Sequence, residues 1–257
     1  MKEQDKNLLS KERHVEIIEY IKKNGSAHVD ELAKKLSVST MTIRRDLTKL
    51  SEDGVIERCF GGAIIKPEVN LIYNSEGGNA EQIKLARKAA WLVKEGNSVF
   101  LDAGNTVYEI AKRIKDIPGI TCVTNDIRTA KVLNRGSANV IICGGLLQKG
   151  TDSVFDAYSL SMLADFRFDV GFFGANAISD NFEILTSTMD RIGFKRSIPE
   201  KCRKAYLIAT ADKFHKNRVG FINTLSDYDG VFTNYQFSDT EQKKLSELKI
   251  NIMPMEY

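Results

Sequence analysis

Residues 101–106 read LDAGNT and end an apolar run, a combination that can hold an anion. A small glycine-containing loop that leads into a helix presents free backbone amides, and the helix dipole favours negative charge at the same place. We therefore expect Gly104, Asn105 and Thr106 to hold a phosphate. A carboxylate beside a phosphate dianion is repulsive, so Asp102 is expected to accept hydrogen bonds from ligand hydroxyls or from the loop's own amides.

The elements that must position this loop are short, nearly continuous apolar runs. They predict strands in the ranges 98–102, 120–124, 138–143, 169–173 and 204–209. Helix-sized segments such as 106–115 and 126–134 separate most of them. This alternation predicts an α/β fold with a mainly parallel sheet that helices cover on both faces.

Ligands of open parallel sheets bind at the carboxyl ends of the strands, where this chain places small polar residues. We expect four of these residues to join the Asp102 loop in one site: Thr124, Asn125, Gly144 and Gly145. The same residue types also occur in tight turns and helix caps, and for any single loop that interpretation stays open.

A second candidate site lies near the amino terminus, where two helical patterns meet at SVS. Leu32, Ala33 and Leu36 mark the buried side of the first helix. Ile43, Leu47 and Leu50 form the buried stripe of the second, which leaves a basic, hydroxyl-bearing face exposed. Such a face suits a DNA major groove, with Ser39 as the helix N-cap. The alternative for an isolated helix is a solvated charged surface.

The flanking segments favour the DNA-binding interpretation. The segment KERHVEIIEYIKK predicts another amphipathic helix, with Val15, Ile18 and Ile21 on its buried side, and VIERCFGGAII predicts a hairpin. Three helices followed by a hairpin form a winged helix-turn-helix. The predicted DNA-contacting residues are Ser39, Thr40, Thr42, Arg44, Arg45, Lys49 and Arg58.

The whole-chain totals restrict the class of protein. A chain of 257 residues with a net charge of +3 accommodates two domains and permits nucleic acid as a partner without requiring it. No stretch has the length and apolarity of a signal peptide or a membrane span, so a cytoplasmic location without a membrane partner is expected. Four scattered cysteines and three histidines lack ligand spacing, so we predict no metal site, no disulfide framework and no cofactor.

The pattern changes once along the chain, at a stretch that contains Pro67, Gly77, Gly78 and three asparagines. We predict a winged helix-turn-helix domain over residues 8–65, a linker over 66–79, and an α/β sensing and oligomerisation domain over 80–257.

The order of these motifs resembles a known family. The segment VDELAKKLSVSTMTIRRDLTKLSEDGVIERCFGGA closely resembles the amino-terminal signature of the DeoR family of bacterial transcriptional regulators. That signature contains E-L-A, V-S, T-I-R-R-D-L, G, and R followed by G-G-A. Phe60 departs from it, because histidine is common there. Farther along, LDAGNT, CVTND, ICGGLL, DVGFFGANAIS and ADKF are similar to the family's later landmarks, so the resemblance covers about residues 8 to 235.

The resemblance implies a carboxyl-terminal domain similar in fold to ribose-5-phosphate isomerase, which binds a phosphorylated sugar or sugar intermediate as effector. It adds Lys195 and Lys213 to the effector site, because both match lysines of the family pattern, and Lys149 is a weaker candidate. Asp156 stands where the family usually has glycine. Thr210 stands where an aspartate usually precedes the lysine. These two departures bear on which effector fits.

We therefore predict a DNA-binding transcriptional regulator, a repressor of a carbohydrate operon that a phosphorylated sugar controls, without enzymatic activity. A single small module makes few DNA contacts, so a homodimer or homotetramer on repeated half-sites is expected. Two other hypotheses stay open: a sugar-phosphate isomerase-like enzyme, and a DNA binder that responds to no ligand.

Overall fold

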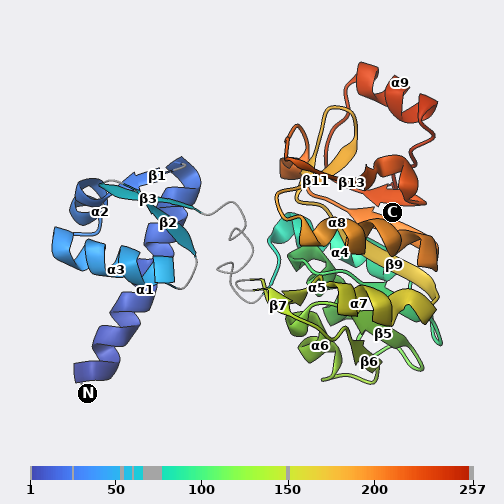
Figure 1. Cartoon of the computed structure of the whole chain (residues 1–257), viewed down its shortest axis with the longest axis horizontal. Helices are drawn as coiled ribbons and strands as arrows, with labels where there is room; N and C mark the ends of the chain where they lie inside the picture. Colours follow the sequence, from blue (N-terminus) through green and yellow to red (C-terminus); the bar gives the residue numbers. More distant parts are fainter. Residues whose placement is uncertain are drawn as a thin grey trace. The chain divides into compact units, whose positions relative to one another are not determined.

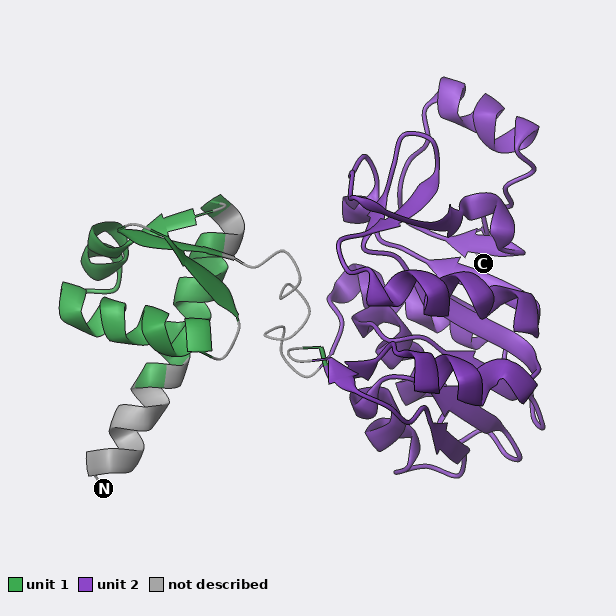
Figure 2. Ribbon diagram, viewed as in Figure 1, with its two compact units in different colours: residues 1–75, 149–151 green, residues 76–148, 152–257 purple. Residues whose placement is uncertain are grey.

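A computed structural model of the chain describes residues 2–24, 26–52, 55–59, 61–65, 77–148 and 151–254. Two compact units make up the chain, one built chiefly from residues 1–75 and the other chiefly from residues 76–148 and 152–257 (Figure 2). Most of the predicted linker, and the positions of Phe60 and Lys149, fall outside the described residues. Within the described ranges, no helix has the length and apolarity that crossing a membrane requires.

The smaller unit contains three helices and a small antiparallel sheet (Figure 1). The helices are α1 (Lys2–Asn24), α2 (Val29–Lys35) and α3 (Thr40–Glu52). The strands are β1 (Ser26–His28), β2 (Ile56–Cys59) and β3 (Gly62–Ile65), in the order β1-β3-β2. Three helices and a β2–β3 hairpin match the predicted winged helix-turn-helix.

The core of this unit follows the helical periodicity of its sequence. Ile43, Leu47 and Leu50 of α3 are fully buried, as predicted. The predicted stripe of α1 was wrong at Val15, which is 44% exposed, whereas Ile17 is fully buried. The buried side of α1 is centred on Ile17, Ile18 and Ile21, and at about 100° per residue Val15 lies roughly 110° away from that centre, outside the buried side.

The larger unit is built on a six-stranded, entirely parallel sheet, which confirms the predicted α/β class. Its strand order is β14-β12-β9-β4-β5-β6. All five predicted strands are present. The strands are β4 (Ser98–Leu101), β5 (Thr121–Thr124), β6 (Asn139–Ile142), β9 (Phe168–Gly174), β12 (Cys202–Ile208) and β14 (Gly230–Phe232).

Helices pack on both faces of this sheet, because alternate side chains of each strand point to opposite faces. In β4, Val99 and Leu101 join one apolar cluster, whereas Phe100 joins the other. The first cluster includes residues of α4 and α5, and the second includes Phe194 of α8. The helices of this unit are α4 (Ala80–Ala90), α5 (Asn105–Ile114), α6 (Ile127–Leu133), α7 (Ala157–Met162), α8 (Asp190–Ser197) and α9 (Asp239–Glu247).

Two small antiparallel sheets were not anticipated from the sequence. One has the order β10-β11-β13 and the other pairs β7 with β8. Their strands are β7 (Leu147–Gln148), β8 (Ser153–Val154), β10 (Ala177–Ile178), β11 (Glu183–Thr186) and β13 (Gly220–Thr224). β7, β8 and β10 are two residues long, too short for a hydrophobic pattern, and β11 and β13 each contain only two consecutive apolar residues.

Candidate functional site

The first turn of α3 is capped as the sequence predicts. The Ser39 hydroxyl accepts a hydrogen bond from the Thr42 backbone amide at 3.1 Å, and the two hydroxyls lie 2.9 Å apart. A side-chain oxygen at this position satisfies one of the amides that a helix start leaves free. The cap therefore fixes where α3 begins, and with it which side chains of α3 face solvent.

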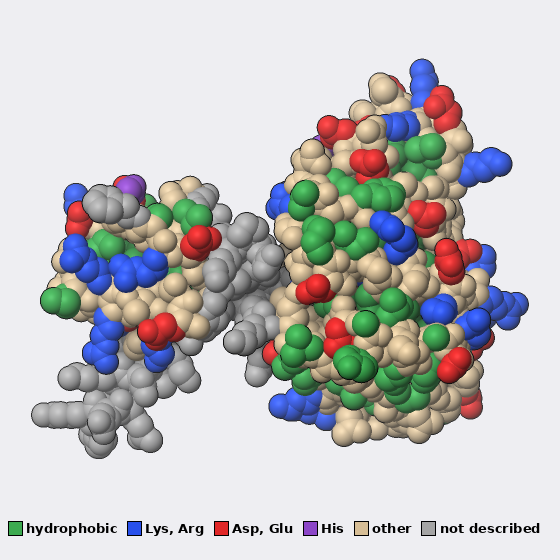
Figure 3. Space-filling model, viewed as in Figure 1, with side chains coloured by type: hydrophobic (Ala, Val, Ile, Leu, Met, Phe, Trp, Pro, Cys, Tyr) green, Lys and Arg blue, Asp and Glu red, His purple; other side chains and the backbone are tan. Residues whose placement is uncertain are grey.

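The exposed face of α3 is basic. Arg44, Arg45 and Lys49 are exposed, and Thr40 and Thr42 accompany them at the amino-terminal end. Figure 3 shows Lys and Arg side chains gathered on this unit over the region of α2 and α3. Arg58 of β2 belongs to the same face, because its Nη1 donates to the Thr48 hydroxyl of α3 at 2.9 Å. The hairpin and the helix thus present their cations together.

A buried carboxylate, which the sequence analysis did not identify, fixes α3 against α1. Asp46 is only 5% exposed and accepts from Arg13 through both of its oxygens, at 2.6 and 3.1 Å. The Nε2 atom of His14 lies 3.1 Å from the same carboxylate. The hydrogen bond from Arg13 to Asp46 raises the pKa of the guanidinium above its ordinary value. Asp46 therefore holds the helix that carries the exposed cations.

In the larger unit, the predicted polar loops lie together at one edge of the sheet. Leu101 pairs in register with Thr124 of β5 and with Phe172 of β9. Asp102 therefore stands beside Asn125 on one side and close to the end of β9 on the other. The parallel register explains why residues far apart in the sequence converge here.

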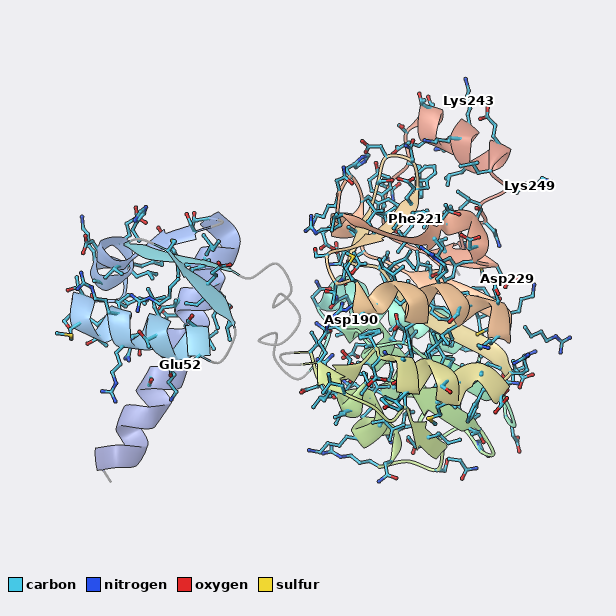
Figure 4. All side chains as sticks on the ribbon, viewed as in Figure 1. Glu52, Asp190, Phe221, Asp229, Lys243 and Lys249 are labelled. Carbon is cyan, nitrogen blue, oxygen red and sulfur yellow. The ribbon has the colours of Figure 1, made fainter. Side chains whose placement is uncertain are left out.

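Asp102 and Lys195 form a buried ion pair in this edge. Lys195 Nζ lies 2.5 Å from Asp102 Oδ2 and donates to the carbonyl oxygen of Gly174 at 2.8 Å. The Gly174 amide donates to the same Oδ2 at 3.2 Å. Asp190, labelled in Figure 4, marks the first turn of α8, which carries Lys195. The side chains of Asp102 and Lys195 are 1% and 9% exposed, so this pair is built into the fold.

In the residues that directly follow β4 and β5, two oxygen atoms are buried without a hydrogen-bond partner among the described residues. They are Oδ1 of Asp102 and Oδ1 of Asn125, and both residues are almost completely buried. Leaving such an acceptor unpaired costs about 1–3 kcal/mol. A ligand with hydroxyl groups would remove this cost, so these two atoms are candidate acceptors for it.

The loop between β4 and α5 leaves the start of that helix open. Gly104 is the N-cap residue of α5 and has a φ angle of +151°, which only glycine adopts without strain, and no side chain among the described residues caps the helix. Asn105 and Thr106 are 6% and 9% exposed. The first-turn amides of α5 are therefore available to an anion, in the place that the sequence predicts.

The Gly144–Gly145 loop is closed by the chain's own carboxylate. Asp156, the N-cap of α7, accepts from the backbone amides of Leu146 and Ser159. These hydrogen bonds, that from Leu146 first, lower the pKa of the Asp156 carboxyl below its ordinary value. A side chain at Gly145 would lie 2.3 to 2.6 Å from the carboxylate, so only glycine fits against it. The residue that departs from the family pattern therefore occupies this turn.

Lys213 lies after β12 and pairs with its neighbour. Its Nζ is 2.8 Å from Oδ2 of Asp212, and Thr210 donates to the other oxygen of that carboxylate. Burial raises the pKa of Asp212, but the hydrogen bonds from Lys213 and Thr210 outweigh it and lower the pKa overall. The structure brings Lys195 to Asp102, and it leaves Lys213 engaged with Asp212 beyond the end of β12.

These sites define a class of protein: a DNA-binding transcriptional regulator that joins a winged helix-turn-helix to a sensor domain. The comparisons agree with this class. The family descriptions "DeoR-like helix-turn-helix domain" and "DeoR C terminal sensor domain" match residues 13–68 and 79–235. The chain belongs to the DeoR family.

Curated relatives cover most of the chain. The glycerol-3-phosphate regulon repressor of Escherichia coli is 30% identical over 87% of this chain and 90% of its own length. The HTH-type transcriptional regulator FruR of Bacillus subtilis is 31% identical, over 80% and 84%. The repressor CsqR of Escherichia coli is 28% identical, over 94% of each chain.

Solved structures are more distant. Ribose 5-phosphate isomerase A from Methanocaldococcus jannaschii is 11% identical over 52% of this chain and 53% of its own, with a TM-score of 0.38. The translation initiation factor eIF-2B of Pyrococcus horikoshii is 13% identical over 88% of each chain, with a TM-score of 0.40. At these scores neither structure bears on the function.

Proposed function

We propose that this regulator represses a carbohydrate operon and that a phosphorylated sugar, bound at the carboxyl ends of β4, β5 and β9, controls its DNA binding. The observation that carries the proposal is the pair of unpartnered buried oxygens of Asp102 and Asn125 beside the open start of α5. The two oxygens can accept hydrogen bonds from hydroxyl groups, and the neighbouring amides can bind an anion. Together they match the hydroxyl and phosphate groups of a sugar phosphate.

The ion pair between Lys195 and Asp102 makes this arrangement electrostatically reasonable. A free carboxylate would repel the phosphate, whereas Lys195 offsets the charge of Asp102 and leaves its Oδ1 to accept from a hydroxyl. We assign Thr124, Asn125, Gly144 and Gly145 to the border of the same site, and Lys213 to its β12 side.

The effector acts through a coupling free energy between effector binding and DNA binding. To change DNA binding it must prefer one arrangement of a dimer or tetramer, and a coupling of about 1–3 kcal/mol changes operator affinity about 5- to 150-fold. Binding alone supplies this free energy, and no chemical step is required. The names of the relatives as repressors favour this mechanism over an isomerase.

A fluorescence-anisotropy titration of operator DNA tests the proposal. We expect a member of a panel of phosphorylated three- to six-carbon sugars, glycerol 3-phosphate included, to shift operator affinity at least fivefold without being converted. Lys195→Arg keeps the charge beside Asp102 and should retain operator binding, but its larger planar guanidinium cannot reproduce the contacts of Nζ with Asp102 and Gly174, so the response should be lost. Lys213→Gln should likewise retain operator binding and lose that response.

Each of the other outcomes contradicts the proposal in its own way. Turnover of a bound sugar phosphate would identify an enzyme. Operator binding that none of the panel changes would identify a DNA binder that responds to no ligand. A full response in both lysine variants would place the pocket elsewhere.

A further inference from the structure

Three groups of backbone amides at the sheet edge could receive a phosphate, and two of them are already filled, one of these by Asp126 at the start of α6. The amides of Leu146 and Ser159 donate to the Asp156 carboxylate, which lies against Gly145. An anion at this turn would have to displace a resident anion. The start of α5 has no such occupant among the described residues, because its N-cap is Gly104, which has no side chain to cap it.

A cation lies beside the open start of α5. Arg128, in the first turn of α6, donates from Nη1 to the side chain of Asn105, the first residue of α5, at 3.2 Å. Its Nη2 donates to Asp126 at 3.1 Å, and its guanidinium lies over the ring of Tyr108 at 5.8 Å. Three contacts from two helices therefore hold the guanidinium next to the first-turn amides of α5.

The guanidinium retains donors. Arg128 Nε is buried and has no partner within the part of the chain that the structure describes, and the side chain as a whole is 30% exposed. A guanidinium has five N–H groups in a planar fork that matches two phosphate oxygens. Since Nη1 and Nη2 each donate one of these hydrogen bonds, three of the five N–H groups have no hydrogen-bond partner among the described residues.

The two lysines of the proposed site, Lys195 and Lys213, already bind groups of the protein itself. Lys195 is held by Asp102 and the carbonyl oxygen of Gly174, and Lys213 is held by Asp212. Arg128 is also paired with a carboxylate, Asp126, but that carboxylate is itself committed to the amides of Arg128 and Thr129 as the cap of α6. Among these three cations, Arg128 combines spare donors with a position beside unoccupied amides.

The geometry points to Arg128 as the residue that binds the phosphate of the effector, together with the first-turn amides of α5. This inference rests on the proposed function and narrows it. The effector carries a phosphomonoester at one end, and Arg128 binds it. Hydroxyl groups toward the other end donate to the unpartnered oxygens of Asp102 and Asn125. An uncharged sugar lacks the group that Arg128 would bind.

Titration with inorganic phosphate and with ribose 5-phosphate, followed by amide and arginine-side-chain NMR, tests the assignment on the full chain. We expect both probes to shift the amides of residues 105–107 and the Nε–H of Arg128. Arg128→Gln should raise the dissociation constants of both probes about tenfold or more, because hydrogen bonds between the guanidinium and the phosphate are lost. Arg135→Gln, which removes an exposed arginine just beyond α6, should leave them unchanged.

The outcomes separate the two hypotheses. Equal binding by the wild type and Arg128→Gln would overturn the role of Arg128 and leave the sugar-phosphate sensor standing. Binding of neither probe by the wild type, and of no member of the sugar-phosphate panel, would overturn both. Arg128→Lys, which keeps the charge near Asp126, replaces the Gln variant if that one does not fold, and it should weaken binding by a smaller factor because the planar fork is lost.

Discussion

The two units of this regulator use positive charge in opposite ways. In the smaller unit, Arg44, Arg45 and Lys49 are exposed, and no described carboxylate pairs with them. In the larger unit, Lys195 and Arg128 are paired with Asp102 and Asp126 inside the fold. Exposed positive charges attract a polyanion over a distance, and salt screens this attraction. Positive charges that are paired inside the fold interact only with a group that comes into direct contact with them. The contrast suits a DNA surface and a small-molecule site.

The strongest test of this contrast is to unpair the buried lysine. Lys195→Met leaves Asp102 without its cation in a nearly solvent-free place, so we expect a loss of about 3–5 kcal/mol in the free energy of unfolding of the larger unit. Urea denaturation measures it. Lys131→Met, which removes an exposed lysine of α6, should cost less than about 0.5 kcal/mol. A loss below about 1 kcal/mol for Lys195→Met would show that water reaches the pair.

The second test concerns the exception in the smaller unit, where Asp46 is paired and buried. Asp46→Ala leaves Arg13 and His14 without their carboxylate, and we expect the smaller unit to lose about 2 kcal/mol. This estimate is below that for Lys195, because the Arg13 side chain is 20% exposed. Glu52→Ala, at the exposed end of α3, is the control. Equal unfolding midpoints for both variants would contradict the anchoring role of Asp46.

The third test addresses the exposed cations. Replacement of Arg44 or Arg45 by Ala should weaken operator binding by about 1–3 kcal/mol if that residue contacts a base, or reduce the salt slope by about one if it contacts a phosphate. Stability should not change, because neither side chain is buried. Gel-shift titrations at several salt concentrations distinguish the two contacts, with Arg135→Ala as the charge-matched control. Unchanged binding in both variants would exclude α3 as the recognition helix.

The smallest effect is expected at Asp156, a half-buried carboxylate that caps α7. Asp156→Ala should cost about 1 kcal/mol near neutral pH, the usual value of an N-cap. The pKa of Asp156 is lowered in the fold, so its contribution is complete above its unfolded pKa of about 3.9 and is lost as the pH falls through the lower folded pKa.

Urea denaturation at several pH values measures this dependence. The difference in unfolding free energy between wild type and Asp156→Ala should stay constant down to about pH 5 and shrink below about pH 4. A difference that already shrinks between pH 7 and about pH 5 would contradict the lowered pKa, because it would require a carboxyl that titrates above its ordinary range.

Much of the architecture could be predicted from local patterns. The stripe of Ile43, Leu47 and Leu50, the Ser39 cap and the parallel strands are all confirmed, because each depends on residues a few positions apart. The placement of the Asp102 loop at the sheet edge followed from the parallel arrangement of the strands. The short antiparallel strands and the side of α1 that is buried near Val15 were not predicted correctly, because their local periodicity is weak.

The sequence by itself determined the two kinds of unit, the basic face of α3 and the polar loops that follow the parallel strands, because hydrophobic periodicity and turn residues act over short distances along the chain. Only the tertiary structure decided the partners of the charges. Lys195 meets Asp102 across 93 positions and Arg13 meets Asp46 across 33. Long side chains reach whichever opposite charge the packing brings within about 3 Å, and no local pattern encodes that choice.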